Sequence, residues 1–200
     1  MKIICIGRNY NKHILELKNN VPHDVIFFLK PETAIPLKNQ PFFIPDFSSE
    51  IHHEVEVVIK INKTGKHIQE KFACNYYNEI SLGIDFTARD LQDKIKENRE
   101  PWEKSKAFDG SAPVGKFINV KNIQKLNFKL LVNGEIRQLG NTQNMIHSVD
   151  YLIHYVSQFI TLKKGDLIFT GTPSGVGKVK KNDLLEGFIE NEKILEVKVV

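Results

Sequence analysis

HHEVEVV, residues His52–Val58, carries more structural information than any other stretch of this 200-residue chain. Read as a strand with a period of two, it places Glu54 and Glu56 on one face and Val55 and Val57 on the other. The two carboxylates then stand about 7 Å apart on a strand built for burial. Buried like charges are costly unless a cation neutralises them. The alternative is a solvent-facing edge on which both carboxylates are hydrated.

Outward from this stretch, the chain contains many short segments of β-branched and aromatic residues bounded by turn residues, which is typical of strands. We expect strands at Lys2–Ile6, Val25–Leu29, Val55–Ile61, Ser81–Asp85, Phe128–Val132, Asp166–Thr170 and Ile194–Val199. Asn133-Gly134 predicts a type I′ hairpin between Phe128–Val132 and Ile136–Gln138, because both central residues can adopt a positive φ.

Helices are expected to be fewer, at Asn11–Leu17, Arg89–Glu97 and Val149–Ile160. The last has apolar residues at a 3.6-residue period behind Ser148, which is suited to be the N-cap. Strands do not alternate regularly with helices long enough to be crossovers. The sequence therefore favours an α+β arrangement of rolled sheets over a doubly wound parallel sheet.

Composition excludes several classes of protein. With 41% hydrophobic and 26% charged residues, the sequence has the profile of a single soluble globular domain. It shows no apolar run long enough to span a membrane and no signal peptide, so we expect a cytoplasmic protein without a membrane partner. The net charge of +4 comes from lysines scattered among acids, which does not predict nucleic-acid binding. Cys5 and Cys74 lack C-x-x-C spacing, and we expect both to be small buried hydrophobes.

A third carboxylate, Asp85, follows at the end of a predicted strand. Three carboxylates without cysteine, and without a histidine pair at ligand spacing, favour a hard cation, by default Mg²⁺ or Mn²⁺ in its place. The zinc-protease motif H-E-x-x-H is absent, because Val57 stands where the second histidine is required.

The glycine-rich run Gly171–Lys178 is not a Walker loop, since five residues separate its outer glycines and Val179 follows the lysine. It predicts a tight loop whose backbone N–H groups receive a carboxylate, or else a plain turn. His13 and Glu16, three residues apart, would share a helix face as an acid–base pair, or lie on the surface. Nothing local distinguishes Lys106 from a solvated lysine, and no G-x-S-x-G nucleophile elbow is present.

Six segments in chain order resemble the fumarylacetoacetate hydrolase family, specifically its short single-domain acylpyruvase and oxaloacetate decarboxylase branch. They are Gly7–Tyr10, Phe28–Pro31, His52–Glu56, Asp85–Gln92, Lys106–Asp109 and Gly165–Gly177. Together they span nearly the whole chain and favour the metal site over hydrated carboxylates. One departure is Ala107, where relatives often carry a small polar residue.

The resemblance implies a β-rich α+β fold, a mixed β-sandwich roll with peripheral helices. It implies one catalytic domain over residues 1–200, a mobile lid around residues 10–22, and a homodimer. The metal, Mg²⁺ with Mn²⁺ possible, is expected on Glu54, Glu56 and Asp85. The resemblance makes His13, Glu16 and Lys106 catalytic, and it places Arg8, Lys30, Arg89, Gln92 and Thr172 around the substrate.

The implied activity is cleavage of a C–C bond in small 2-oxo acids, by acylpyruvate hydrolysis, oxaloacetate decarboxylation or both. The metal is expected to polarise the 2-oxo group and stabilise the pyruvate enolate. Glu16, assisted by His13, would activate water for hydrolysis, and Lys106 would stabilise an oxyanion. A tautomerase or isomerase acting on oxaloacetate or a related dioxo acid at the same site is the alternative, and a non-catalytic metal-stabilised binding module is a more distant one.

Overall fold

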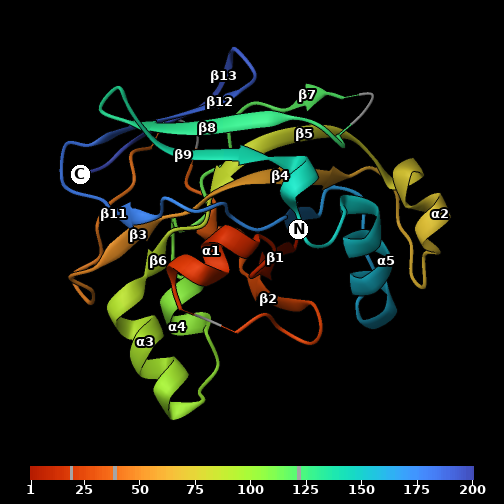
Figure 1. Cartoon of the computed structure of the whole chain (residues 1–200), viewed down its shortest axis with the longest axis horizontal. Helices are drawn as coiled ribbons and strands as arrows, with labels where there is room; N and C mark the ends of the chain where they lie inside the picture. Colours follow the sequence, from red (N-terminus) through yellow and green to blue (C-terminus); the bar gives the residue numbers. More distant parts are fainter. Residues whose placement is uncertain (19, 38–39, 121–122) are drawn as a thin grey trace.

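Over the residues that the structure describes, the protein is β-rich, with three sheets and short peripheral helices, as expected from the sequence (Figure 1). The computed structural model describes residues 1–18, 20–37, 40–120 and 123–200, so residue 19 of the predicted lid lies outside the described residues. The strands are β1 Ile3–Gly7, β2 Ile26–Lys30, β3 Ile51–His53, β4 Val55–Ile61, β5 Tyr77–Ile84, β6 Thr87–Ala88, β7 Ile118–Asn119, β8 Asn127–Val132, β9 Glu135–Asn141, β10 Leu167–Phe169, β11 Gly177–Lys178, β12 Leu184–Ile189 and β13 Glu192–Lys198. The helices are α1 Asn11–Glu16, α2 Glu70–Ala73, α3 Arg89–Asn98, α4 Glu103–Lys106 and α5 Val149–Phe159, with 3₁₀ turns η1 Glu32–Ala34, η2 Cys74–Tyr76 and η3 Thr142–Asn144.

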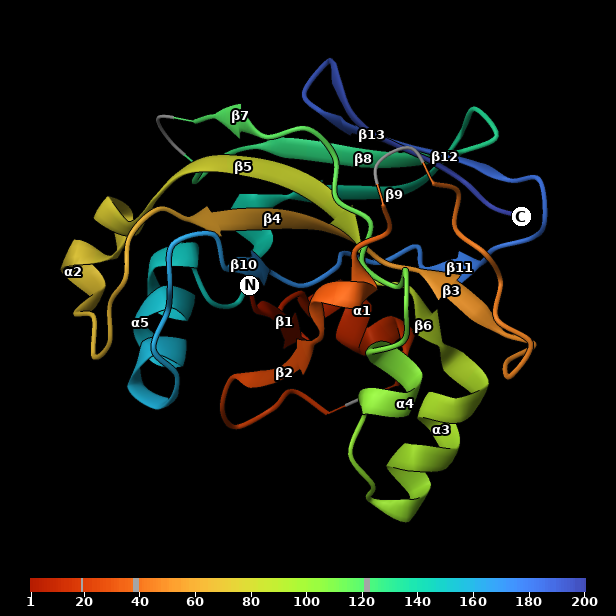
Figure 2. The same cartoon turned by 180° about the vertical axis from the view of Figure 1, so that it is seen from behind.

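The largest sheet has the strand order β2-β1-β10-β4-β5-β7, in which β1 and β10 are parallel and the other neighbours antiparallel. A four-stranded antiparallel sheet, β13-β12-β8-β9, stacks on the β4–β5 region, and β11-β3-β6 forms a small third sheet. Figures 1 and 2 show α1, α3 and α4 on the side of the large sheet opposite β8 and β12, with α2 and α5 together at one end.

Strand β4 separates two environments because its residues alternate between faces. Val55, Val57 and Ile59 point into the main core between the stacked sheets, whereas Val58 packs in a smaller cluster with residues of β1 and β10. Glu56 shares the face of Val58. The sequence alternation therefore sends the carboxylate away from the main core and toward the helices.

Gly83 allows β5 to lie close to its neighbours. It pairs with Glu56 of β4, and a Cβ on Gly83 would come within 2.5 Å of the Phe169 ring. A larger residue would push β5 out of the sheet two positions before Asp85. Glycine here fixes the strand whose end carries the third carboxylate.

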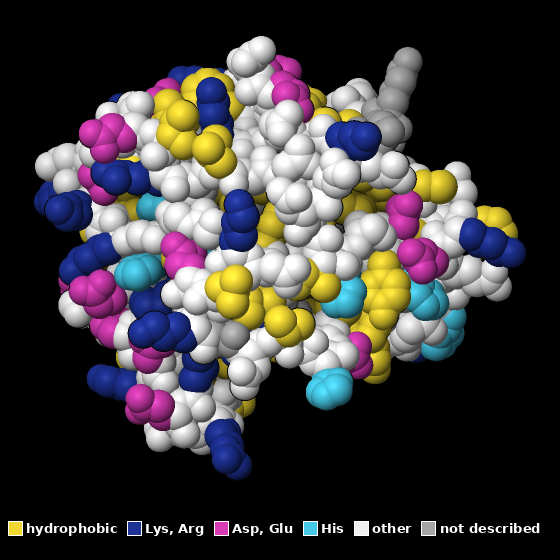
Figure 3. Space-filling model, viewed as in Figure 1, with side chains coloured by type: hydrophobic (Ala, Val, Ile, Leu, Met, Phe, Trp, Pro, Cys, Tyr) yellow, Lys and Arg dark blue, Asp and Glu magenta, His cyan; other side chains and the backbone are white. Residues whose placement is uncertain are grey.

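Several local predictions are confirmed. Helix α5 begins behind Ser148, whose Oγ accepts the N–H of Tyr151 at 3.1 Å, and the hairpin residues Asn133 and Gly134 have φ values of 53° and 81°. One prediction is wrong, since Cys74 is exposed on η2 and only Cys5 is buried. Within the described ranges, no helix combines the length and apolarity needed to cross a membrane. On the face shown in Figure 3, basic and acidic side chains are interspersed.

Candidate active site

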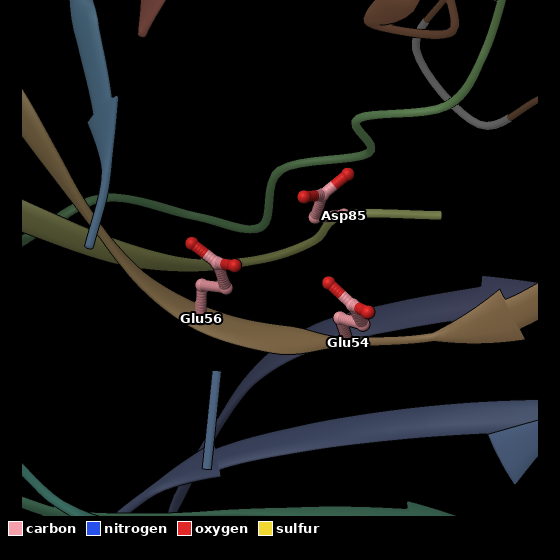
Figure 4. Close-up of side chains that lie close together, drawn as sticks. All are labelled: Glu54, Glu56 and Asp85. Carbon is pink, nitrogen blue, oxygen red and sulfur yellow. The ribbon is translucent and has the colours of Figure 1, made fainter. Parts of the chain in front are cut away.

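Three carboxylates converge at the ends of two neighbouring strands (Figure 4). Glu54 lies between β3 and β4, Glu56 lies on β4, and Asp85 directly follows β5. The backbone N–H of Asp85 donates to the carbonyl of Glu54 at 2.8 Å, which continues the β4–β5 ladder to the site. One oxygen from each carboxylate lies within 4.8 Å of the others, and all three side chains are buried. Their burial excludes the hydrated-edge alternative.

Two buried lysines contact this carboxylate cluster. Lys106 Nζ lies 2.8 Å from Glu54 Oε2 and 2.7 Å from Asp85 Oδ2, and it donates to Thr87 Oγ1 at 2.6 Å. Lys30 Nζ lies 2.7 Å from the other oxygen of Asp85. Both oxygens of Asp85 are thus paired with ammonium groups.

Arg89, the first residue of α3, forms an ion pair with Glu54 through Nη2. Its Nη1 donates to Gln92 Oε1 at 2.6 Å, one helical turn further along. Glu54 is therefore held by Arg89 on one oxygen and by Lys106 on the other.

The three carboxylates differ in their electrostatic surroundings. Burial alone would raise the pKa of Glu54, but Lys106 and Arg89 outweigh it and hold that pKa well below the usual range. Burial would likewise lower the pKa of Lys106, but Asp85 and Glu54 outweigh it and raise that pKa. Burial, and next the charges of Asp85 and Glu54, raise the pKa of Glu56 well above its usual value.

Glu56 is the carboxylate that lacks a cation. Within the described ranges no lysine or arginine forms an ion pair with it, and the N–H of Gly171 donates to Oε2 at 2.7 Å. A divalent cation between Glu56 and its two neighbours would supply the missing positive charge. The all-oxygen donor set suits Mg²⁺ or Mn²⁺, so these residues fit the metal expected from the sequence.

The predicted acid–base pair lies on α1, beside the cluster. His13 Nδ1 is 3.4 Å from Glu16 Oε2, and Glu16 also accepts the N–H of Gly175. Burial lowers the pKa of His13 despite the opposing effects of Glu54 and Glu16. The imidazole is therefore mainly neutral near pH 7 and can accept a proton.

The glycine-rich loop receives carboxylates, the first of the two alternatives that its sequence leaves open. Gly171 N–H binds Glu56, and Gly175 N–H binds Glu16. Gly171 has a φ of +98°, and a Cβ there would come within 2.7 Å of Asn9 Cβ. Only glycine fits this conformation without strain, so the loop holds the carboxylate cluster and α1 in one arrangement.

A small cavity of about 30 Å³ joins these elements. Its lining contains most of the catalytic, substrate-binding and metal-ligating residues expected from the sequence, namely Arg8, His13, Glu54, Glu56, Asp85, Arg89, Gln92, Lys106 and Thr172. Two expected residues, Lys30 and Glu16, lie outside the lining; Lys30 pairs with Asp85, and Glu16 accepts the N–H of Gly175. Thr172 Oγ1 donates to the carbonyl of Val55 at 2.9 Å.

Comparison with known sequences identifies the family. The family described as "Fumarylacetoacetate (FAA) hydrolase C-terminal" matches residues 2–200. The chain belongs to the fumarylacetoacetate hydrolase family. The resemblance inferred from the ordered segments is thereby confirmed.

Named members of the fumarylacetoacetate hydrolase family match over almost the whole chain. The mitochondrial oxaloacetate tautomerase of Rattus norvegicus is 42% identical over 200 residues, covering 98% of this chain and 90% of that protein. The mitochondrial oxaloacetate decarboxylase of Dictyostelium discoideum is 43% identical over 189 residues, covering 92% and 87%. Fumarylpyruvate hydrolase from Pseudomonas aeruginosa, crystallised with Mn²⁺ and pyruvate, is similar in structure with a TM-score of 0.93 at 35% identity, covering 100% of this chain and 89% of that one.

Sequence reasoning missed one residue that organises this fumarylacetoacetate hydrolase site. Gln138 alone is buried among the residues of β9, and its Oε1 accepts the N–H of Val55 and lies 3.0 Å from His53 Nδ1. Its Nε2 donates to Thr172 Oγ1 at 2.8 Å and to the carbonyl of Pro173 at 2.9 Å. The strand pattern around the hairpin placed Gln138 on β9, but nothing in it indicated these partners.

Lys96 also lines the cavity of this family member, although the sequence analysis did not single it out. The spacing of Lys96 in the sequence could have indicated its position. This lysine follows Gln92 by four residues and Arg89 by seven, which places it on the same face of a helix.

Proposed function

We propose that this protein is an enzyme that acts on small 2-oxo acids with Mg²⁺ or Mn²⁺, cleaving a C–C bond by decarboxylation of oxaloacetate, hydrolysis of acylpyruvates, or both. The observation that carries the proposal is the buried cluster of Glu54, Glu56 and Asp85, in which Glu56 lacks a cation, beside the pair His13–Glu16. The names of the relatives support it, since they act on oxaloacetate or fumarylpyruvate and one was crystallised with Mn²⁺ and pyruvate.

A divalent cation on this cluster would supply Lewis-acid polarisation of the 2-oxo group, which lowers the energy of an enolate. The chain supplies the charge balance. Lys30 and Lys106 contact Asp85, and Arg89 contacts Glu54, so these cations offset the ligand charge that would otherwise repel an anionic substrate. Lys106 is the cation of this group that contacts two carboxylates and lines the cavity, where its ammonium can stabilise negative charge on oxygen.

The pair on α1 serves hydrolysis. Glu16 accepts a proton from water, while His13, held 3.4 Å away, orients and relays that proton. Attack of this water on the distal acyl carbonyl releases a carboxylic acid and the pyruvate enolate. Decarboxylation of oxaloacetate needs no water, because loss of CO₂ leaves the same enolate.

Tautomerisation is the second candidate, and the neutral imidazole of His13 favours it. His13 lines the cavity and its pKa is lowered, chiefly by burial, so it can remove a proton from C3 and return it to oxygen. The same enolate connects all three reactions, and they differ in which bond breaks next.

We also propose that α1 moves as part of the expected lid, whose described residues are 10–18 and 20–22. The cavity of about 30 Å³ has room for only a few water molecules, whereas oxaloacetate has nine non-hydrogen atoms. Arg8, His13 and Leu17 form its wall on the α1 side. Displacing α1 is the simplest way to admit a substrate.

A parallel assay tests the proposed function. The purified protein is given acetylpyruvate or oxaloacetate with Mg²⁺, with Mn²⁺ or with EDTA, and both enol absorbance and coupled pyruvate formation are followed. Metal-dependent formation of pyruvate is expected. The ratio of the rates of pyruvate formation from the two substrates shows whether hydrolysis or decarboxylation is the main activity. Enol loss without pyruvate would identify the tautomerase instead. Inactivity on both substrates with metal bound would overturn the proposal.

We further propose a homodimer located in the cytoplasm. Two apolar side chains on the outer strand β9, Ile136 and Leu139, are 54% and 65% exposed and offer an apolar surface for a second copy. Light scattering at micromolar concentration is expected to give twice the chain mass.

A further inference from the structure

Helix α3 presents three polar side chains to the cavity along one face. Arg89, Gln92 and Lys96 follow each other at i, i+3 and i+7, and all three line the cavity. The rise of 1.5 Å per residue places Lys96 about 10 Å along the axis from Arg89. Arg89 marks the inner end of this row, because it contacts the metal-ligating Glu54. Lys96 marks the outer end.

Arg89 and Gln92 are committed to partners, and Lys96 is not. Arg89 binds Glu54 and Gln92. In the described parts of the chain, Lys96 has no carboxylate at ion-pair distance and no hydrogen bond from its ammonium group. Yet its side chain is half-buried, and burial, followed by the charges of Arg89 and Arg8, lowers its pKa to about 8. A half-buried ammonium that stays mainly charged at pH 7 without a partner is unfavourable until an anion reaches it.

We propose that Lys96 is a specificity-determining residue that binds the distal carboxylate of dianionic 2-oxo acids, with Arg8 adding positive charge beside it. This inference rests on the proposed function, in which the 2-oxo acid group lies at the inner end of the cavity. The second carboxylate of the same molecule then extends toward Lys96. The site would thereby favour dicarboxylic 2-oxo acids over acylpyruvates that end in an alkyl group.

Oxaloacetate and acetylpyruvate form a matched pair for this test. The two acids share their 2-oxo acid group and the adjoining methylene, and at the distal carbon oxaloacetate has a carboxylate oxygen where acetylpyruvate has a methyl group. The two acids are almost equal in size, so a cation at the outer end of the cavity distinguishes them by their charge.

Removal of the Lys96 ammonium group is expected to change KM rather than kcat. The distal carboxylate loses its charge as CO₂ leaves, so Lys96 stabilises bound oxaloacetate at least as much as the transition state of decarboxylation. A hydrogen bond to a charged group contributes enough binding free energy for roughly a 10-fold change in affinity or more. Lys96→Met is thus expected to raise KM for oxaloacetate about 10-fold with kcat maintained, and to leave KM for acetylpyruvate within about twofold.

Two variants serve as controls. Lys96→Arg keeps the charge and is expected to retain the preference for oxaloacetate. Lys94→Met removes a lysine from the solvent-exposed side of the same helix, and it is expected to leave KM for both substrates unchanged. If Lys96→Met changed KM equally for both substrates, or left KM for oxaloacetate unchanged, the inference would be overturned while the proposed function stayed intact.

A binding measurement separates the inference from the proposed function. Calorimetry of the Mg²⁺-loaded protein compares 2-oxoglutarate with 2-oxopentanoate, two five-carbon acids that end in a carboxylate and a methyl group. The wild type is expected to prefer the dianion about 10-fold, and Lys96→Met is expected to lose that preference. This result with an inactive wild type would support the inference and refute the proposed function. Equal affinity of the wild type for both acids would refute the inference.

Discussion

The N–H of Gly175 lies 3.0 Å from Oε1 and 3.2 Å from Oε2 of Glu16, and this contact joins helix α1 to the glycine-rich loop. Four residues earlier in the same loop, the N–H of Gly171 donates to Glu56, an expected metal ligand. The loop therefore connects the expected general base to the expected metal site. Displacing α1 breaks the contact with Glu16 while the contact with Glu56 stays in place.

Glu16→Gln is expected to separate the two cleavage reactions. The amide cannot accept the proton of an attacking water, so acylpyruvate hydrolysis should fall by roughly 100-fold or more. Oxaloacetate decarboxylation should survive at least in part, because no water attack is needed. Steady-state rates of the variant and the wild type on acetylpyruvate and on oxaloacetate measure the two activities. Parallel collapse of both activities would mean that Glu16 acts in closing the lid rather than as a base.

Lys106→Met is expected to lower kcat by about 10²–10³, as is typical when a donor to an oxyanion is removed. Metal affinity should be kept or increased, because the ammonium that contacts Glu54 and Asp85 competes with Mg²⁺ for the same carboxylates. Calorimetric titration with Mg²⁺, alongside kcat, measures both quantities. Lys104→Met, at an exposed position of the same helix α4, is the matched control. Loss of metal affinity equal to the loss of kcat would contradict the assignment.

Residues that follow a local period were predictable from the sequence. The alternation around Glu54 and Glu56 predicted their shared face, and the i, i+3 spacing of His13 and Glu16 predicted their contact. Asp85 was recognised as a third carboxylate because it follows a predicted strand, but a strand end does not indicate which strand lies beside it, so the resemblance was needed to place Asp85 next to Glu54 and Glu56. Pairing of β4 with β5 is a long-range contact that one sequence does not encode in any short pattern.

Residues whose role depends on several distant segments escaped prediction. Gln138 has partners on β3, on β4 and on the loop after β10, so its role exists only once these segments meet. The pairing of Lys106 with Glu54 and Asp85 is similar, since its local sequence resembles that of any solvated lysine. The short strands β6, β7 and β11 also lack a period long enough to recognise.

Glu56→Gln is expected to remove the stabilisation of the fold by metal. Saturating Mg²⁺ at about 100 times its dissociation constant contributes about 2.7 kcal/mol, or roughly 5–10 °C in Tm for a domain of this size. Without the Glu56 carboxylate this shift should largely disappear. The metal-free variant should be at least as stable as metal-free wild type, since it lacks a buried carboxylate without a cation. Thermal melts with Mg²⁺ or EDTA measure this, and Glu192→Gln on the exposed part of β13 is the control. An unchanged Mg²⁺ shift would exclude Glu56 as a ligand.

Binding of oxaloacetate should weaken above pH 8 if Lys96 receives the distal carboxylate. The pKa of Lys96 is lowered to about 8 by burial, then by Arg89 and, less strongly, Arg8, with Asp93 and Glu54 acting in the opposite direction. Raising the pH through this value removes the proton and the positive charge, whereas both carboxylates of oxaloacetate stay ionised. KM for oxaloacetate should therefore rise between about pH 7 and 9 in the wild type, by up to roughly 10-fold. Lys96→Arg should give a flat profile, because guanidinium keeps its proton throughout this range. A wild-type profile that the arginine variant reproduces would assign the titration to another group.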